Sequence, residues 1–305
     1  MQCTPSEKSE FMSYYGIDVS EFQGNISWQE VAQEKITFCF VRTGYCENDG
    51  TVVEDAYFTQ NVEGSTAVGI STGLYLFSYA TTPQAARTAA KEFLELAEEY
   101  RLTMPLVLDM EDEDTYGALG VQQNTDIAAA FLDEIEEGGY YAMLYTNADF
   151  AEEYLDMSQL SAYDFWVADY ADSVSYTGSY GIWQYTDSDT VSGISTEVDG
   201  DIAYKNYPNI IKNAGLNALS ATKTTTDSEG HTTTKPTTLV VGDKVQIQKE
   251  AKYYANSIIQ IPSWVKQQIL KVAQISGNKA LLMPIYSWVY SSDLIVVGNT
   301  QCDTQ

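Results

Sequence analysis

The segment Met104-Pro105-Leu106-Val107-Leu108-Asp109-Met110-Glu111-Asp112 is a short apolar run that ends in closely spaced carboxylates. A run of this length, preceded by proline and followed by acids, predicts a buried strand of a parallel sheet. Side chains two apart on a strand point to the same face, so Asp109 and Glu111 are expected side by side at its carboxyl end. Barrels and open α/β sheets place their ligand crevices at that end.

Two interpretations of this acidic strand end are open. Two neighbouring carboxyls cannot both ionise freely, so the pKa of one is raised and that group becomes a candidate general acid. Alternatively, Asp109 and Glu111 belong to an acidic cap, because the acids of 112–114 follow and a run of acids is usually solvated. The segment by itself supports both interpretations.

The composition predicts a folded chain with room for one large and one small domain. Of its 305 residues, 44% are apolar and 12% aromatic, which suffices for a substantial core. No apolar stretch approaches the roughly 20 residues that span a bilayer, so no membrane insertion is expected. Residues 1–14 lack the basic and apolar regions of a secretory signal. We expect either a signal removed from this sequence or another route of export, such as release by a lysing cell.

Charge is distributed unevenly along the chain, whose net charge is −27. Residues 220–305 hold 8 Lys and Arg against 6 Asp and Glu, whereas residues 1–219 hold 8 against 37. A field this negative repels polyanions, so no nucleic-acid partner is expected.

Cysteine and histidine are too sparse for a zinc site. Cys3, Cys39, Cys46 and Cys302 show no CxxC spacing, and His231 is the only histidine. We therefore expect neither a metal nor a cofactor, and an amidase or peptidase, which needs a nucleophile dyad or a metal, is disfavoured. Cys39 lies in an apolar run and is expected to be a buried thiol.

A Thr-rich segment divides the chain. Residues 220–238 hold nine Thr and no large apolar side chain, too little apolar surface to offset the entropy of ordering. The predicted organisation is as follows: an N-terminal tail at 1–13, a barrel at 14–216, a flexible linker at 217–238, a small domain at 239–299 and a C-terminal tail at 300–305.

Short apolar or aromatic runs recur before the linker and predict eight strands. They are Tyr15–Val19, Thr37–Arg42, Gly73–Tyr79, the Met104 run, Tyr140–Tyr145, Asp164–Ala168, Gly181–Tyr185 and Val198–Ala203. Helical spacing separates several of them, most clearly at 83–100 and 124–138. This alternation predicts the α/β class and an irregular (β/α) TIM-like barrel. After the linker, alternating runs around short turns predict a small all-β barrel.

The carboxyl ends of these strands would bring acids and aromatic rings to one mouth. Acids alone would suit a magnesium or calcium ion, whereas rings interleaved with carboxylates suit a sugar, whose C–H faces stack on aromatic rings. For each ring, packing in the barrel is about equally compatible with the pattern. The expected sugar-groove residues are Tyr75, Phe77, Tyr79, Tyr145, Asn147, Trp166, Tyr170, Trp183 and Gln184.

Five motifs in order resemble the glycoside hydrolase family 25 muramidases, the Chalaropsis-type lysozymes of phages and bacteria. They are Gly16–Gly24 (GIDVSEFQG), Pro105–Glu111 (PLVLDME), Leu144–Asn147 (LYTN), Trp183–Thr186 (WQYT) and the pair 198–199 (VD). The resemblance covers residues 14 to about 207. It implies an irregular β/α barrel that cleaves the β-1,4 bond between N-acetylmuramic acid and N-acetylglucosamine. We expect a monomer that acts on bacterial peptidoglycan, outside the cell or in the wall.

The resemblance also implies roles for four acids. Glu111 would be the general acid, with its pKa raised by neighbouring carboxylates. Asp109 would stay ionised and stabilise positive charge on the sugar or on an oxazolinium formed by the substrate's N-acetyl group. Asp18 and Asp199 would orient substrate or water. Asp201 departs from the family, which commonly has an amide or apolar residue there, so Asp199 and Asp201 both stay candidates for the fourth acid.

The small domain resembles bacterial SH3-like wall-binding modules in Ile261–Val265 and Ile285–Tyr290. A flexible tether would raise the effective concentration of the barrel at the wall. A second hypothesis for the whole chain is a non-catalytic wall-binding protein on a degenerate glycosidase barrel, which misplaced acids would favour.

Overall fold

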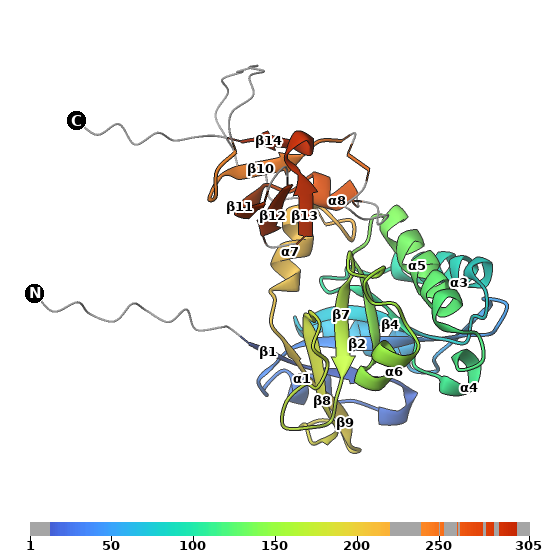
Figure 1. The fold of residues 1–305 in the computed structure, drawn as a ribbon. Coiled ribbons are helices and arrows are strands. Elements are labelled where there is room, and N and C mark those ends of the chain that lie inside the picture. The colour runs from blue at the N-terminus through green and yellow to red at the C-terminus, as the bar shows by residue number, and fades with distance from the viewer. Residues whose placement is uncertain are drawn as a thin grey trace, which may run out of the picture.

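The larger part of the protein is a closed barrel, and the predicted α/β class is confirmed (Figure 1). The structure is a computed structural model that describes residues 13–219, 239–249, 251–252, 261, 263–276, 279–283 and 287–297. Eight strands form the barrel wall: β1 (Tyr14–Val19), β2 (Ile36–Cys46), β4 (Ser71–Ser78), β5 (Leu106–Asp109), β6 (Ala142–Asn147), β7 (Asp164–Ala168), β8 (Ile182–Asp189) and β9 (Val198–Ala203).

The sheet order makes the barrel irregular in one specific way. The strands follow the order β1-β9-β8-β7-β6-β5-β4-β2-β3, and a parallel pairing of β1 with β2 closes the ring. β9 runs antiparallel to both of its neighbours, β8 and β1. Its first residues therefore lie at the end of the barrel where the parallel strands finish. A short hairpin strand, β3 (Val52–Glu54), extends β2 and was not predicted.

Aromatic rings fill the inside of the barrel. The rings of Phe40 and Trp166 stack with centroids 4.6 Å apart. Glycines make this filling possible, because a Cβ on Gly16 would meet the ring of Phe38 at 2.3 Å and one on Gly73 would meet the ring of Phe40 at 2.5 Å. Side chains alternate across each strand, so the intervening residues form a second apolar layer under the helices.

Helices cover the outside of the barrel. They are α1 (Trp28–Val31), α2 (Phe58–Ala67), α3 (Pro83–Ala97), α4 (Glu113–Tyr116), α5 (Val121–Glu137), α6 (Ala148–Glu153) and α7 (Tyr207–Ala214). The two predicted helices are α3 and α5, which lie side by side (Figure 1) with the rings of Phe93 and Phe131 6.0 Å apart. α3 begins as expected, because the Thr82 hydroxyl accepts the Ala85 N–H at 3.1 Å and Pro83 occupies the first turn.

The segment that follows α7 packs against the barrel wall. Asn217 is buried, and its Oδ1 accepts the Tyr141 N–H at 2.9 Å. Its Nδ2 donates to the carbonyl of Met104 at 2.9 Å, at the entry to the segment that leads into β5. Asn217, which the prediction assigned to the linker, therefore packs with the barrel.

The described residues after 238 form a five-stranded antiparallel sheet, in the order β13-β12-β11-β10-β14. Its elements are β10 (Lys244–Ile247), α8 (Ser263–Lys266), β11 (Leu270–Ser276), β12 (Lys279–Met283), β13 (Ser287–Tyr290) and β14 (Leu294–Val296). β11 and β12 pair as far as Ser276 with Lys279. The SH3-like assignment stays a prediction, and Pro262, Ile285 and Tyr286 of its two motifs lie outside the described residues. Throughout the described ranges, no helix is long and apolar enough to cross a membrane.

Candidate active site

The end of β5 brings Asp109 and Glu111 to the same side of the strand, as predicted. Between them, Met110 is fully buried in the outer layer, and its N–H donates to the Tyr145 carbonyl at 3.1 Å, so the pairing with β6 continues past Asp109. The next acid behaves differently, because the Asp112 carboxylate accepts the Thr115 N–H at 2.9 Å and caps α4. The acidic cap is thus real but begins at Asp112.

Glu111 has a strongly perturbed carboxyl. Burial, followed by the charges of Asp199 and Asp112, raises its pKa to about 7, whereas hydrogen bonds from Tyr145 and Asn147 act in the opposite direction. A group with this pKa is protonated in a large fraction of molecules at neutral pH and loses its proton readily. This combination is what a general acid requires.

Asp109 lies deeper than Glu111. It is buried, and its Oδ1 has no hydrogen-bond partner among the described residues. Burial raises its pKa well above the usual range, the charge of Glu111 raises it further, and the guanidinium of Arg42 lowers it. Because the charge of Glu111 raises the pKa of Asp109, the two carboxyls release their protons in separate steps. The unpartnered oxygen is available to a donor group of a ligand.

The junction of β1 and β9 adds three more acids. Asp18 of β1 pairs directly with Asp199 of β9, and Asp201 follows two residues further into the barrel, opposite Gly16. Asp201 is completely buried, and its Oδ1 accepts the Trp166 Nε1–H at 2.9 Å. Asp199 is only partly buried. Burial, then the charge of Asp187, raises the pKa of Asp199 to about 6.

Gln184 connects both sides of this acidic mouth. Its Nε2 donates to Asp18 Oδ2 at 2.8 Å, while its Oε1 accepts the hydroxyls of Tyr145 and Tyr170, each also at 2.8 Å. Burial and the charges of Asp199 and Asp201 raise the pKa of Asp18, and the bond from Gln184 opposes them. Gln184 is therefore a buried positioning group between the acids.

The predicted sugar-groove rings occupy three kinds of position. Trp166 is 1% exposed, stacked on Phe40 and bonded to Asp201, so no face of its ring is free for a sugar and that prediction is wrong. Trp183 neighbours Gln184 on β8 and so points to the opposite face, where it packs with the outer layer and donates to the Asp169 carbonyl at 2.8 Å. It is not a wall of the inner mouth.

The other rings lie closer to the acids. Tyr145 is buried over Trp166, with centroids 4.6 Å apart and its hydroxyl on Gln184. The ring of Tyr75 also packs on Trp166, with centroids 6.4 Å apart. Burial, followed by the charges of Asp18 and Asp109, raises the pKa of the Tyr75 hydroxyl.

Phe77 pairs with Asp109 across β4 and β5, and both Phe77 and Tyr79 stay partly exposed, with their rings 5.0 Å apart. These two rings keep surface available beside the acid pair.

A pocket opens beside Glu111, with a volume of about 310 Å³. Tyr170, which is 53% exposed, forms part of its wall. Asn147 lines the same pocket, but its Oδ1 accepts the Phe150 N–H at 2.8 Å and caps α6. The Asn147 amide therefore caps α6 with its oxygen and also hydrogen-bonds to Glu111. The lining residues are Glu111, Asn147, Ala148, Asp149, Ala168, Asp169, Tyr170 and Ser175.

Arg42 and Asp55 are the residues near the mouth that sequence reasoning missed. Arg42 Nε donates to Asp55 Oδ2 at 2.8 Å, and the Asp55 side chain is fully buried. One signal was available, because Arg42 is the only Lys or Arg between Lys35 and Arg87 in a strongly acidic part of the chain. Nothing in the spacing of residues 42 and 55 pointed to their pairing.

Among the residues that the structure describes, no group of three or more His, Cys, Asp or Glu side chains is arranged to hold a metal ion. Cys39 is buried, as predicted, and burial raises the pKa of its thiol to about 12.

A β/α barrel with perturbed carboxyls and aromatic rings at one mouth is the arrangement of a glycoside hydrolase. The chain belongs to the glycosyl hydrolases family 25, whose family model matches residues 17–194. A protein of Escherichia coli O157:H7 called YegX, itself uncharacterized, is 28% identical over 196 residues, which are 62% of this chain and 68% of YegX. Lysozyme M1 of Streptomyces globisporus is 28% identical over 205 residues, 60% of this chain and 65% of that enzyme.

Solved structures agree with this assignment. The modular autolysin LytC from Streptococcus pneumoniae superposes with a TM-score of 0.55 at 27% identity, covering 62% of this chain and 46% of LytC. The chain therefore spans about half the length of that autolysin.

Proposed function

We propose that the protein is a muramidase that hydrolyses the β-1,4 bond between N-acetylmuramic acid and N-acetylglucosamine in peptidoglycan. Membership of family 25 and similarity to lysozymes and an autolysin support a peptidoglycan hydrolase. The observation that carries the proposal is the acid pair of β5, where Glu111, with a pKa of about 7, lies next to buried Asp109.

Glu111 acts as the general acid and protonates the leaving oxygen of the glycosidic bond. Asp109 takes the opposite role and carries negative charge as positive charge develops on the sugar. Its unpartnered Oδ1 suits an acetamido N–H of the substrate, which would hold that group for attack on the anomeric carbon through an oxazolinium. Burial and the charge of Glu111 raise the pKa of Asp109, and Arg42 opposes them by favouring its charged form. Asp18 and Asp199 orient substrate or water from the facing strands, and Gln184 holds Asp18.

The position of the acids argues against a degenerate, non-catalytic barrel. All four candidate acids sit at the β5 and β1/β9 ends of one barrel mouth. Burial raises the pKa of each, and perturbed carboxyls of this kind gather where chemistry requires them.

Product analysis tests the proposed bond. Purified peptidoglycan is digested with the protein, and the fragments are reduced and analysed by mass spectrometry. A muramidase leaves N-acetylmuramic acid at every new reducing end. Glucosamine ends would identify a glucosaminidase instead, and intact glycan with cleaved peptides would rule out a glycosidase.

We further propose that residues 239–299 form an SH3-like wall-binding module, joined to the barrel by the predicted linker, of which residues 220–238 lie outside the described part of the chain. The five-stranded antiparallel sheet supports this. The protein would then act as a monomer in the wall or outside the cell. Co-sedimentation with purified walls tests the module, because the full chain carrying Glu111→Gln should pellet more completely than the same variant ending at Leu219.

A further inference from the structure

Phe22 is the most exposed large apolar residue that the structure describes, with 72% of its surface accessible. It lies in the single turn η1 (Glu21–Gln23), directly after β1 and therefore at the end of the barrel where Asp18 lies. Single exposed apolar residues are common on proteins and carry no meaning by themselves. Phe22 is distinguished by its position in a turn that hydrogen bonds and an ion network hold in one conformation.

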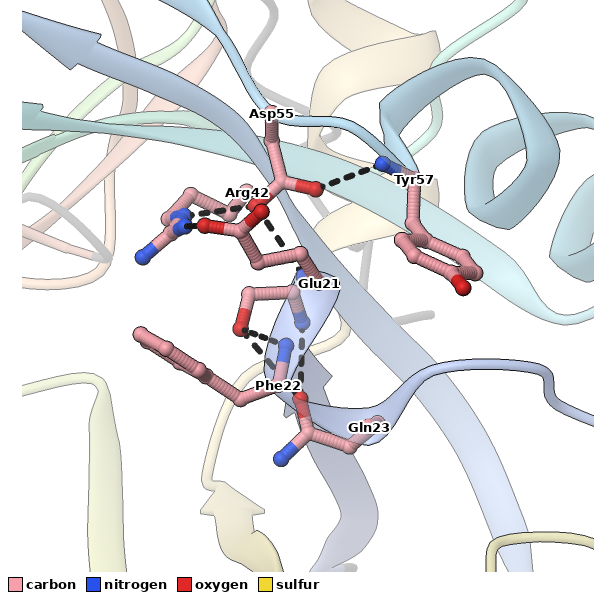
Figure 2. A network of polar contacts seen from close by, with 7 residues as sticks. Glu21, Phe22, Gln23, Arg42, Asp55 and Tyr57 are labelled. Atoms are coloured by element: carbon pink, nitrogen blue, oxygen red, sulfur yellow. Dashed lines mark hydrogen bonds and ion pairs between the residues drawn. The ribbon is translucent and has the colours of Figure 1, made fainter.

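The turn that carries Phe22 is locked by its own hydrogen bonds (Figure 2). The Ser20 hydroxyl accepts the Phe22 N–H at 3.2 Å, and Gln23 Oε1 accepts the Ser20 N–H at 2.9 Å, which forms a complete capping box. Gln23 Nε2 also donates to the Glu197 carbonyl at 3.3 Å, two residues before Asp199. The turn is thus tied to the loop that leads into β9.

An ion network supports the same turn from β2 (Figure 2). Arg42 Nε lies 2.8 Å from Asp55 Oδ2, and Arg42 Nη2 lies 2.9 Å from Glu21 Oε1. Asp55 also accepts the backbone N–H groups of Glu21 at 3.0 Å and of Tyr57 at 2.9 Å. With three donors on the buried Asp55 carboxylate and a second bond from Arg42 to Glu21, the guanidinium has little freedom to move.

The guanidinium in turn fixes the ring of Phe22. Its central carbon lies 4.9 Å from the ring centroid, within the range of a cation–π contact. Arg42 also faces the catalytic side, because it pairs with Tyr75 across β2 and β4 and its charge lowers the pKa of Asp109. One side chain therefore links the exposed ring to the acid pair.

We propose that Phe22 is a stacking subsite for a hexosamine ring of the glycan strand that lies outside the cleaved pair of sugars. This inference rests on the proposed muramidase function. The guanidinium occupies one face of the ring, which leaves the opposite face to the C–H surface of a pyranose. Arg42 and Asp55 are positioning residues, and their network removes the cost of ordering the ring when a glycan binds.

The direct test measures glycan binding without hydrolysis. The full chain carrying Glu111→Gln is titrated calorimetrically with peptide-free tetra-, hexa- and octasaccharides of alternating N-acetylglucosamine and N-acetylmuramic acid. The octasaccharide should bind more tightly than the tetrasaccharide. Adding Phe22→Ala should lower the ratio of the two affinities by about 3- to 10-fold, and Phe22→Trp should keep the ratio.

A matched control is Tyr15→Ala, because Tyr15 is also exposed on β1 but lies near the opposite end of the strand. It should leave the ratio unchanged. An unchanged ratio in Phe22→Ala would overturn the inference, as would an equal loss of affinity for every chain length, which indicates a structural role. Absence of any binding by the parent, together with no reducing ends released by the native protein, would instead refute the muramidase function itself, and the inference with it.

A double-mutant cycle tests the positioning role of Asp55. Asp55→Ala should lower the octasaccharide-to-tetrasaccharide ratio as Phe22→Ala does, and combining the two should produce no further decrease. A purely structural role of Asp55 would weaken binding of every oligosaccharide alike and would add to the effect of Phe22→Ala. That additive result would remove Arg42 and Asp55 from the subsite.

Discussion

Asp18 lies directly opposite Asp199 in the antiparallel pairing of β1 with β9. This pairing completes the acidic mouth. Because β9 is antiparallel to β1, the first residues of β9 lie beside the last residues of β1. Burial, and after it the charge of Asp199, raises the pKa of Asp18. Across the mouth the same Asp199 is the leading charge that raises the pKa of Glu111. One partly buried carboxylate therefore influences both sides of the site.

Replacing Glu111 with Gln should reduce the release of reducing sugars from peptidoglycan at least about 1000-fold, because the leaving oxygen loses its proton donor. The fold should survive, since Gln has nearly the size of Glu and keeps an oxygen that accepts from Asn147. A reducing-sugar assay with circular dichroism measures both. Glu113→Gln is the matched control, an exposed acid of α4 that should leave activity unchanged. Activity retained in Glu111→Gln would remove Glu111 as the acid.

The rate should fall on the alkaline side with a midpoint near pH 7. The general acid must be protonated, and Glu111, with a pKa of about 7, loses its proton as the pH rises through that value. Asp199→Asn removes the charge that contributes most to the raised pKa after burial, so the alkaline midpoint should move to lower pH. The pH dependence of kcat/KM measures the shift. A midpoint that stays in place or moves upward would contradict this coupling.

Gln184→Leu should lower kcat by about 10-fold or more, because Asp18 loses its hydrogen-bond donor and the hydroxyls of Tyr145 and Tyr170 lose their shared acceptor. KM should change less, since this buried amide orients acids rather than carrying substrate. Gln159→Leu, in an exposed amide pair with Gln122, serves as control. A change confined to KM would instead make Gln184 a direct sugar ligand.

Much of the barrel could be predicted from sequence because its strands are short apolar runs with helices between them. The alternation of side chains also placed Asp109 and Glu111 on one face without knowledge of the fold. β3 was missed because its three residues carry no pattern, and the reversed direction of β9 leaves no mark in its composition.

The packing of each ring inside the barrel was not predictable. Tyr145 and Trp166 pair with each other across β6 and β7, yet Trp166 is enclosed by Phe40 and bonded to Asp201, whereas Tyr145 reaches the acids. The contact of Arg42 with Asp55 joins a strand to a loop, and no local spacing rule encodes such a pair.

The acids of the mouth should make the protein less stable as the pH rises. Burial raises the pKa of Asp18, Asp109 and Asp201 in the folded state, whereas in the unfolded chain they titrate near about 3.9. Between the two values the folded state holds more protons, so the free energy of unfolding decreases from about pH 4 upward through the raised pKa values. Chemical denaturation at pH 5 and pH 8 should show the lower value at pH 8.

Asp201→Asn should weaken this decrease. The amide cannot ionise, and its carbonyl oxygen can still accept the Trp166 Nε1–H. At pH 8 the variant should therefore be more stable than the native protein, by roughly 1–3 kcal/mol, while at pH 5 the difference should shrink. Asp172→Asn, at an exposed acid, should leave the pH dependence unaltered. The free energy of unfolding of Asp201→Asn could instead decrease between pH 5 and pH 8 as steeply as that of the native protein. The buried acids would then not be the source of the destabilisation, and the site would carry its charge without a cost in stability.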